Sequence, residues 1–300
     1  MQVVVVSPKG VLYRGAVGFA DDPITTNHVG NLYSITKFFT ACAILKLIEQ
    51  GKLRLDTRIC DIITIKDWQE VFNDCTVEQL ICHTVGMPNP LPLAWIRPAD
   101  GMHDDIDEDT KLLDILRNNP PKPSPPYPYA YSNVGYWILG KVLATVSQRP
   151  MSDFGGICQA LLWPGKEELL TTTFPKNALI QVGHVRRWYM LGIMTPFLVP
   201  TWLSTSKIID SASGRFRCMP SHYLDGASYG GLLGSTEAVG SFLSELISGK
   251  ILNQQSMGLL LKPQIPQMTC GLHLRHHKGI TIYHKEGGGA GCHSSIHFRP

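Results

Sequence analysis

The chain has 300 residues, of which 44% are hydrophobic, and it contains 28 glycines and 21 prolines. These values are ordinary for a globular protein with a substantial core, so we expect one large domain or two interleaved ones. The 27 basic and 24 acidic residues leave a formal net charge of +3 without a dense basic cluster, which argues against nucleic acid as a partner.

The eight cysteines are scattered and form no C-x-x-C pair, so the sequence predicts no zinc ribbon, no redox motif and no cofactor. Buried thiols and an N-terminus without a secretory signal favour a cytoplasmic location. The longest apolar stretch, residues 188–203, is interrupted by Pro196 and Pro200 and is shorter than the roughly 20 residues that a spanning helix needs. We expect no transmembrane segment, and we leave peripheral membrane contact and the oligomeric state open.

The first elements predicted along the chain are a hairpin and a buried helix. Residues 3–7 and 11–19 flank a Pro-Lys-Gly turn at residues 8–10, a pattern typical of two strands joined by a turn. Residues 34–50 then read as a helix, with Gly51 as its C-terminal cap. Apolar side chains occupy nearly the whole circumference of this helix, so we expect it to lie buried between layers.

The middle of the chain changes to short helices and proline-rich loops. One helix begins at Thr76 and Gln79, which are spaced as in a capping box. Strand patterns return near the C-terminus. We therefore predict a sheet domain made from residues 1–66 and 224–300, with a mainly helical domain, residues 67–223, inserted between its two halves.

The motif S-x-x-K occurs twice, at Ser34 to Lys37 and at Ser204 to Lys207. In a helix, residues three apart share a face, so the lysine can lie beside the serine at the N-terminus, where free N–H groups and the dipole stabilise an oxyanion. Ser34 opens the apolar helix, whereas Ser204 follows Pro200 and precedes no helical pattern. We predict Ser34 as the nucleophile; the simpler interpretation is an N-cap serine followed by a snorkelling lysine.

A third serine signal is Gly226-Ala-Ser228-Tyr-Gly230, which matches the G-x-S-x-G nucleophile elbow of α/β-hydrolases. That alternative requires a strand before the serine, a helix directly after it, and then an acid followed by a histidine. No aspartate follows Asp225, but Glu237 or Glu245 with a later histidine could complete a triad. A glycine-rich loop that leads into a helix over 236–248 is the simpler interpretation, and both stay open at this point.

Two further motifs accompany Ser34. Tyr131-Ser132-Asn133 opens a predicted helix, and His284-Lys285-Glu286-Gly287-Gly288 lies on a predicted strand. With Ser34 and Lys37, these segments resemble the S-x-x-K, Y-x-N and K-T-G (or H-x-G) motifs of the serine β-lactamase and penicillin-binding-protein superfamily, especially its class C and family VIII esterase branch. The stretches 51–56, 80–88 and 229–237 carry the same resemblance. It implies an α/β fold of the DD-peptidase and β-lactamase-like type, with an antiparallel sheet flanked by helices.

The resemblance implies catalytic roles for four residues. Ser34 would attack a substrate carbonyl and form an acyl-enzyme. Tyr131 would accept the serine proton as general base. Its pKa, ordinarily near 10, must be depressed for that role, and Lys37 and Lys285 are the cations expected to depress it.

The remaining motif residues are implied to bind the substrate. The backbone N–H of Gly288, together with that of the serine, would form an oxyanion hole, and Gly287 and Gly288 allow a close approach. Asn133 would hydrogen-bond the first motif's lysine or a substrate amide, and His284 precedes the strand lysine. Glu286 departs from the family's Thr or Ser, and its charge would repel a substrate carboxylate by about 4 kcal/mol at a separation of about 4 Å. This departure favours neutral esters.

Length is the second departure from the family pattern. The chain begins at the family's first strand and stops at Pro300, where the family continues into a last strand and a packing helix. We expect unpaired backbone groups and an uncovered face on the helix of Ser34. The predicted function is a serine hydrolase, with an esterase on small acyl esters placed first. The alternatives are a β-lactamase or D-Ala-D-Ala carboxypeptidase, which cleaves an amide, and a non-catalytic or truncated relative that binds a ligand or partner.

Overall fold

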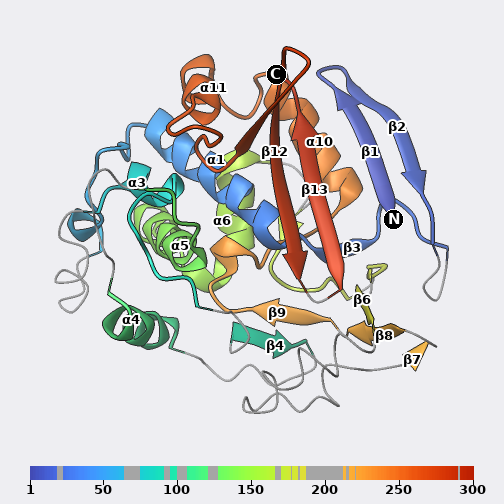
Figure 1. Ribbon diagram of the computed structural model, residues 1–300, viewed down its shortest axis with the longest axis horizontal. Helices are drawn as coiled ribbons and strands as arrows, with labels where there is room; N and C mark the ends of the chain where they lie inside the picture. The colour runs from blue at the N-terminus through green and yellow to red at the C-terminus, as the bar shows by residue number, and fades with distance from the viewer. Residues whose placement is uncertain are drawn as a thin grey trace.

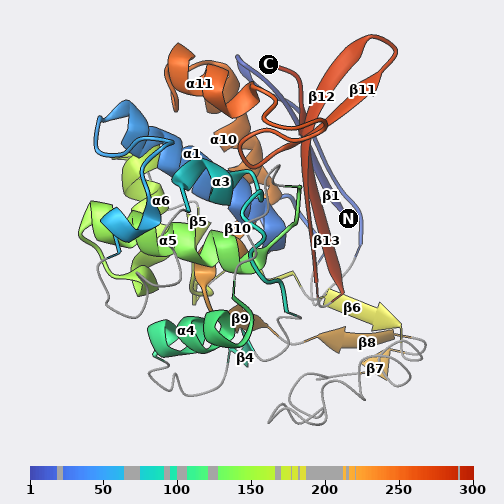
Figure 2. The same cartoon turned by 60° about the vertical axis from the view of Figure 1, so that its left-hand side comes forward.

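The computed structural model describes the residues that form the core and both chain ends. The described residues are 1–18, 23–63, 75–90, 95–99, 107–120, 128–165, 170–176, 178–181, 183–186, 212–213, 216–219, 221–289 and 291–300. The motif at Ser204 and Lys207 and the apolar stretch 188–203 lie outside them. Figure 2 shows helices on one face of strands that come from both ends of the chain.

Strands occur at both ends of the chain, with most of the helices between them (Figure 1). The helices are α1 (Thr36–Glu49), α3 (Val77–Ile81), α4 (Glu108–Asn118), α5 (Asn133–Ser147), α6 (Phe154–Leu162), α10 (Thr236–Ile247) and α11 (Gln254–Leu261), with 3-10 turns η1 (Tyr33–Ile35), η2 (Ile59–Asp61), η4 (Met151–Asp153) and η6 (Ala227–Tyr229). The antiparallel sheets are β1 (Gln2–Ser7) with β2 (Gly10–Ala16); β3 (Val29–Asn31), β10 (Leu233–Ser235) and β5 (Leu170–Thr171); β11 (His273–His277), β12 (Ile280–Gly289) and β13 (Cys292–Phe298); β4 (Ile96–Pro98) with β9 (His222–Leu224); and β6 (Gly183–Arg186), β8 (Phe216–Met219) and β7 (Ala212–Ser213).

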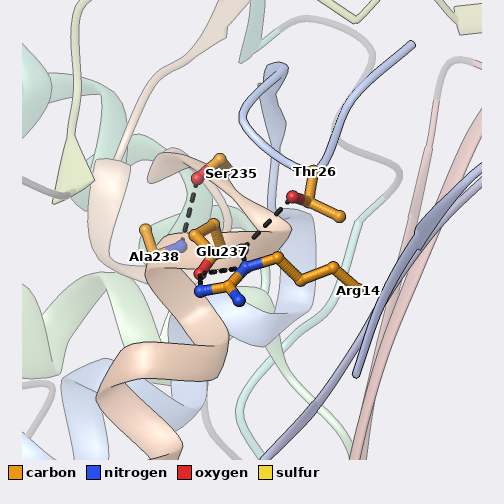
Figure 3. Close-up of polar contacts among 5 residues, drawn as sticks. All are labelled: Arg14, Thr26, Ser235, Glu237 and Ala238. Carbon is orange, nitrogen blue, oxygen red and sulfur yellow. Dashed lines mark hydrogen bonds and ion pairs between the residues drawn. The ribbon is translucent and has the colours of Figure 1, made fainter. Parts of the chain in front are cut away.

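The predicted N-terminal hairpin is confirmed, and an ion pair holds it against α10. Arg14 of β2 donates to both carboxylate oxygens of Glu237 at 2.6–2.9 Å. Thr26 also donates to Glu237, and Ser235 caps the helix by accepting from the N–H of Ala238 at 3.1 Å (Figure 3). Glu237 therefore anchors the hairpin, which argues against its use as the acid of a catalytic triad.

The sheets at the two chain ends remain separate. β1 pairs with β2, and β13 pairs with β12, while the facing edges of β1 and β13 have no strand between them in the described part of the chain. A cavity of about 330 Å³ lies there, lined by the start of β1 and by residues 292–296.

Helix α1 is covered on the face that we expected to be bare. The ring of Phe39 meets Phe242 of α10, and the ring of Phe38 meets both Phe242 and Phe298 of β13, with centroids 4.6–6.0 Å apart. The expectation of an uncovered face is wrong, because α10 and β13 supply the cover. Gly51 follows the helix at φ 70°, the left-handed conformation of a glycine cap, as predicted.

The middle of the chain combines helices with small sheets. The predicted capping box is confirmed: Thr76 accepts from the N–H of Gln79, and the Gln79 side chain accepts from the N–H of Thr76. Strands β4–β9 and β6–β8–β7 belong largely to the segment 67–223. That segment is therefore not purely helical, and its boundaries as a domain stay a prediction.

The G-x-S-x-G segment forms the turn η6 beneath α5. Ser228 is fully buried, and its Oγ donates to the carbonyl of Tyr136 in α5 at 2.8 Å. A nucleophile elbow instead exposes its serine at the top of a sheet. The α/β-hydrolase alternative is therefore wrong, and Ser228 is a packing residue that joins η6 to α5.

Two helical glycines provide a test of this packing. A Cβ atom at Gly140 of α5 would overlap Ser228 Oγ and Met151, whereas one at Gly258 of α11 would meet no atom within 4 Å. Gly140→Ala should lower the free energy of unfolding by about 1–3 kcal/mol through overpacking. Gly258→Ala should raise it by up to about 1 kcal/mol through helix propensity. Urea unfolding measures both changes, and a stable Gly140→Ala variant would contradict the close contact between α5 and η6.

Candidate active site

The turn that carries Ser34 is bent by a left-handed residue. Tyr33 has φ 48°, which is uncommon for a bulky side chain. Its hydroxyl lies 3.1 Å from Nε2 of His222, and its ring lies close to Gly289 of β12, where a Cβ would be 2.7 Å from the ring. These contacts fix η1, and they place Ser34 at the start of the helical segment, facing the residues that precede α5.

Ser34 lies within hydrogen-bond reach of two other predicted site residues. Its Oγ is 2.6 Å from the hydroxyl of Tyr131 and 3.3 Å from Nζ of Lys37. The lysine reaches the serine because the two residues are three apart in one helical segment. The tyrosine reaches it because the loop before α5 crosses the start of α1. The structure therefore brings the first two motifs together, as the resemblance implied.

Lys37 is fully buried, and two acceptors from other segments hold it. Its Nζ donates to Oδ1 of Asn133 at 2.7 Å and to the carbonyl of Tyr229 at 2.8 Å. Burial and the nearby charge of Lys285 lower the pKa of Lys37 well below its ordinary value. A neutral amine has two N–H groups and one lone pair. When Asn133 and Tyr229 accept the two N–H groups, the lone pair is left for the hydroxyl of Ser34.

The pKa of Tyr131 shifts in the direction opposite to the expectation. Burial raises it to about 12, although the hydrogen bond between Tyr131 and Ser34 acts against the rise. The prediction that two lysines depress this pKa is wrong, because burial of the phenol itself is the largest influence and raises it. At neutral pH Tyr131 is a protonated phenol, which can donate a proton more readily than it can accept one.

Strand β12 brings Lys285 close to the Tyr131 ring as well. Lys285 is 1% exposed, and its Nζ lies 5.3 Å from the ring centroid. It has no hydrogen-bond partner among the described residues, and burial lowers its pKa to about 7. Gly287 packs against the serine turn, since a Cβ there would lie 3.0 Å from the backbone nitrogen of Ser34. Gly288 follows at the exposed end of this contact.

His284 and Glu286 lie on the other face of β12. Side chains alternate along a strand, so buried Lys285 directs both of its neighbours away from the serine. Glu286 is exposed, and His284 stacks between His273 and His297, with ring centroids 5.5 Å apart on each side. The side chains of His284 and Glu286 therefore do not lie beside Lys285, and their roles in substrate binding, including repulsion of a carboxylate by Glu286, stay predictions.

Two residues of the site were not predicted from the sequence, because neither belongs to a recognised motif. The carbonyl of Tyr229 accepts from Lys37, and His83 contacts the residues around Tyr131. Both lie in stretches that resemble the family, at 80–88 and 229–237, but a backbone acceptor and a buried imidazole have no spacing that predicts their role. Position in these stretches was the signal that could have found them.

The described residues contain no group of three or more His, Cys, Asp or Glu side chains arranged to hold a metal ion. Among the described helices, none is long and apolar enough to cross a bilayer.

Comparisons with known proteins identify the family and the fold of the chain. The sequence profile of the Beta-lactamase family matches residues 1–156. Penicillin-binding protein 4 of Amycolatopsis lactamdurans is 31% identical over 148 residues, which are 48% of this chain and 36% of that protein. Penicillin-binding protein 4* of Bacillus subtilis is 28% identical over 150 residues, 48% of this chain and 32% of that protein. The matched part of the chain thus spans about a third of these relatives' length.

Solved structures show the same fold across nearly the whole chain. The octameric penicillin-binding protein homologue from Pyrococcus abyssi superposes with a TM-score of 0.70 at 22% identity, covering 96% of this chain and 64% of that one. D-amino acid amidase from Ochrobactrum anthropi SV3, in complex with D-phenylalanine, gives a TM-score of 0.71 at 18% identity over 96% of this chain and 79% of that one. The fold prediction is confirmed, and because the family profile covers more than half of its length, the chain belongs to the beta-lactamase family.

Proposed function

We propose that this protein is a serine hydrolase that forms an acyl-enzyme on Ser34. One observation carries the proposal: Ser34 Oγ lies within hydrogen-bond reach of the amine of Lys37, whose pKa is lowered, and of the phenol of Tyr131. An activated nucleophile needs an adjacent group that accepts its proton, and a departing group needs an adjacent donor. The site offers one candidate for each role.

The two proton transfers follow from the pKa directions. A base role for Tyr131 needs a phenolate, which a pKa of about 12 makes roughly a one-in-100,000 species at pH 7. Lys37, with its lowered pKa, therefore accepts the Ser34 proton as Oγ bonds to the carbonyl carbon. Tyr131 donates its proton to the leaving oxygen or nitrogen as that bond breaks, and a water molecule then releases the acyl group by the reverse transfers.

The oxyanion of the tetrahedral intermediate needs donors that are in place beforehand. The backbone N–H groups of Ser34 and Gly288 are the proposed pair, supported by the close packing of Gly287 on the serine turn. Asn133 gives its oxygen to Lys37, which leaves its amide nitrogen as a donor toward the substrate.

The substrate class is an acyl ester or an amide. Small neutral esters were placed first because of Glu286, but its side chain points away from Lys285 along β12, which weakens that argument. Lys285 favours a second candidate: its Nζ is buried and has no partner among the described residues, so the carboxylate of a peptide or β-lactam would meet a cation there. A non-catalytic relative that only binds such ligands is the remaining alternative.

Covalent labelling tests the nucleophile and the substrate class together. The protein should react with a fluorophosphonate and with a fluorescent penicillin, and peptide mapping should place both labels on Ser34. Ser34→Ala should abolish labelling, while Ser228→Ala and Ser204→Ala should keep it. Label on another serine would overturn the assignment. Labelling without any turnover of esters or amides would instead identify a binding protein.

The leaving group distinguishes the two roles of Tyr131. If Tyr131 donates a proton to the departing oxygen, Tyr131→Phe should slow hydrolysis of an ethyl ester by roughly 100- to 10,000-fold. The loss should be much smaller for a p-nitrophenyl ester, whose leaving group departs as an anion. Steady-state kcat values for the two esters measure this difference. Equal losses would indicate that Tyr131 is the base, as first predicted from the motif.

The burial of Lys285 predicts that this residue lowers stability. A pKa that falls from 10.5 to about 7 costs roughly 4 kcal/mol of folding free energy at pH 7. Between these values the unfolded chain binds more protons, so the free energy of unfolding should rise as pH increases from 7 toward 10.5. Lys285→Met should raise stability at pH 7 by up to this amount and flatten the rise.

Urea unfolding at pH 7 and pH 9 measures both effects. Glu286→Gln, a charge change on the exposed face of the same strand, is the matched control and should alter stability by no more than about 0.5 kcal/mol. A Lys285→Met variant that is less stable than the wild type at both pH values would contradict the cost of burying this lysine.

A further inference from the structure

His83 contacts Tyr131 and the residues on both sides of it, but it takes no part in the proposed proton transfers. It follows α3 with φ 56° in the left-handed region and is 3% exposed. Its ring lies 4.7 Å from the ring of Tyr131, 4.9 Å from Tyr136 and 5.7 Å from Tyr129, measured between centroids. A histidine in this backbone conformation at such depth needs a structural reason.

The hydrogen bonds of His83 hold the residues on both sides of Tyr131. Its backbone carbonyl accepts from the N–H of Ala130 at 2.8 Å. Its Nδ1 accepts from the N–H of Ser132 at 3.1 Å. One residue thus holds the backbone at Ala130 and at Ser132, on both sides of the tyrosine, while its ring packs against the phenol.

We propose that His83 is a positioning residue that holds the Tyr131 hydroxyl against Ser34, and that it can do so only as the uncharged imidazole protonated on Nε2. The inference rests on the proposed function, in which Tyr131 donates to the leaving group. His83 itself touches neither Ser34 nor the substrate. It acts through the loop of residues 130–132.

The tautomer follows from the geometry. A nitrogen that accepts from a backbone N–H carries no proton, so the proton of neutral His83 is on Nε2, which has no partner among the described residues. Protonation of Nδ1 would set two N–H groups against each other at the contact with Ser132. The basic groups near His83 are Lys285, Lys37 and His273, and the adjacent phenols carry no charge at neutral pH. Burial, followed by the proximity of these basic groups, lowers the pKa of His83 well below its ordinary value, which favours the uncharged imidazole.

Two substitutions of equal shape separate the hydrogen bond from packing. His83→Asn puts an amide oxygen where Nδ1 lies, and asparagine tolerates the left-handed region. His83→Leu has the same branched outline without an acceptor. With an ethyl ester, His83→Leu should lower kcat by roughly 10- to 100-fold, since small displacements of a catalytic group are this costly. KM should change little, and His83→Asn should keep kcat within about threefold of the wild type.

A double substitution shows whether the loss passes through Tyr131. In the Tyr131→Phe background, His83→Leu should cause no further loss of kcat, because the group that it positions is gone. If Tyr131→Phe lowers kcat and His83→Leu does not, the positioning role is overturned and the proposed chemistry stands. If Tyr131→Phe has no effect, the proposed chemistry fails instead. Equal kcat values for His83→Leu and His83→Asn would also overturn the role of Nδ1.

A measurement on the unaltered protein covers the case in which His83→Leu does not fold. The ¹⁵N resonances of the His83 ring should report a protonated Nε2 and a bare Nδ1 from pH 8 down to pH 6. A resonance of the charged imidazolium, or of the Nδ1–H tautomer, within that range would overturn the inference.

Discussion

The burial of Lys37 is the physical constraint on which the rest of the site depends. Lys37 lies in the first turn of a helix that is buried on all sides, so its amine cannot be hydrated. A buried nitrogen without acceptors would be strongly destabilising. Asn133 and Tyr229 supply those acceptors, and they come from α5 and η6, about 100 and 190 residues further along the chain. The buried amine of α1 therefore depends on both distant segments for its hydrogen bonds.

The need of buried polar groups for hydrogen-bond partners also explains the polar contacts beneath the site. Thr40, one turn after Lys37, donates to the carbonyl of Ser228 at 2.6 Å, and Ser228 donates in turn to Tyr136 of α5. Thr36 accepts from the N–H of Leu232 at 3.2 Å. Buried hydroxyls that each find a partner rigidify a site and determine a single arrangement of its parts. Ser228, which lies in the motif that resembled a second nucleophile, makes two of these contacts. Its burial helps to hold the carbonyl of the next residue, Tyr229, in place.

Much of this arrangement could be predicted from the sequence, and the failures have physical causes. Ser34 and Lys37 share one helix turn, and Tyr131 and Asn133 lie at the start of a helix, so local spacing identifies them.

Local spacing cannot decide which face of a strand points inward. The sequence therefore predicted that the side chains of His284 and Glu286 lie in the site with Lys285, whereas alternation along the strand directs them to the opposite face. The pKa of Tyr131 was predicted with the wrong sign because burial depth is a property of the whole fold. His83 and the Tyr229 carbonyl are contacts made by tertiary structure, and no periodicity reveals them.

The two lysines together limit the charge that the site can hold. Their Nζ atoms lie 4.8 and 5.3 Å from the centroid of the same tyrosine ring, and each is desolvated. Two ammonium groups so placed oppose each other, and the nearby charge of Lys285 contributes to the lowered pKa of Lys37. A substrate carboxylate or a developing oxyanion would relieve this opposition, because a negative charge stabilises the protonated form of both lysines. Burial lowers the pKa of Lys37 and raises that of Tyr131, and a negative charge appearing beside them would favour transfer of a proton to Lys37.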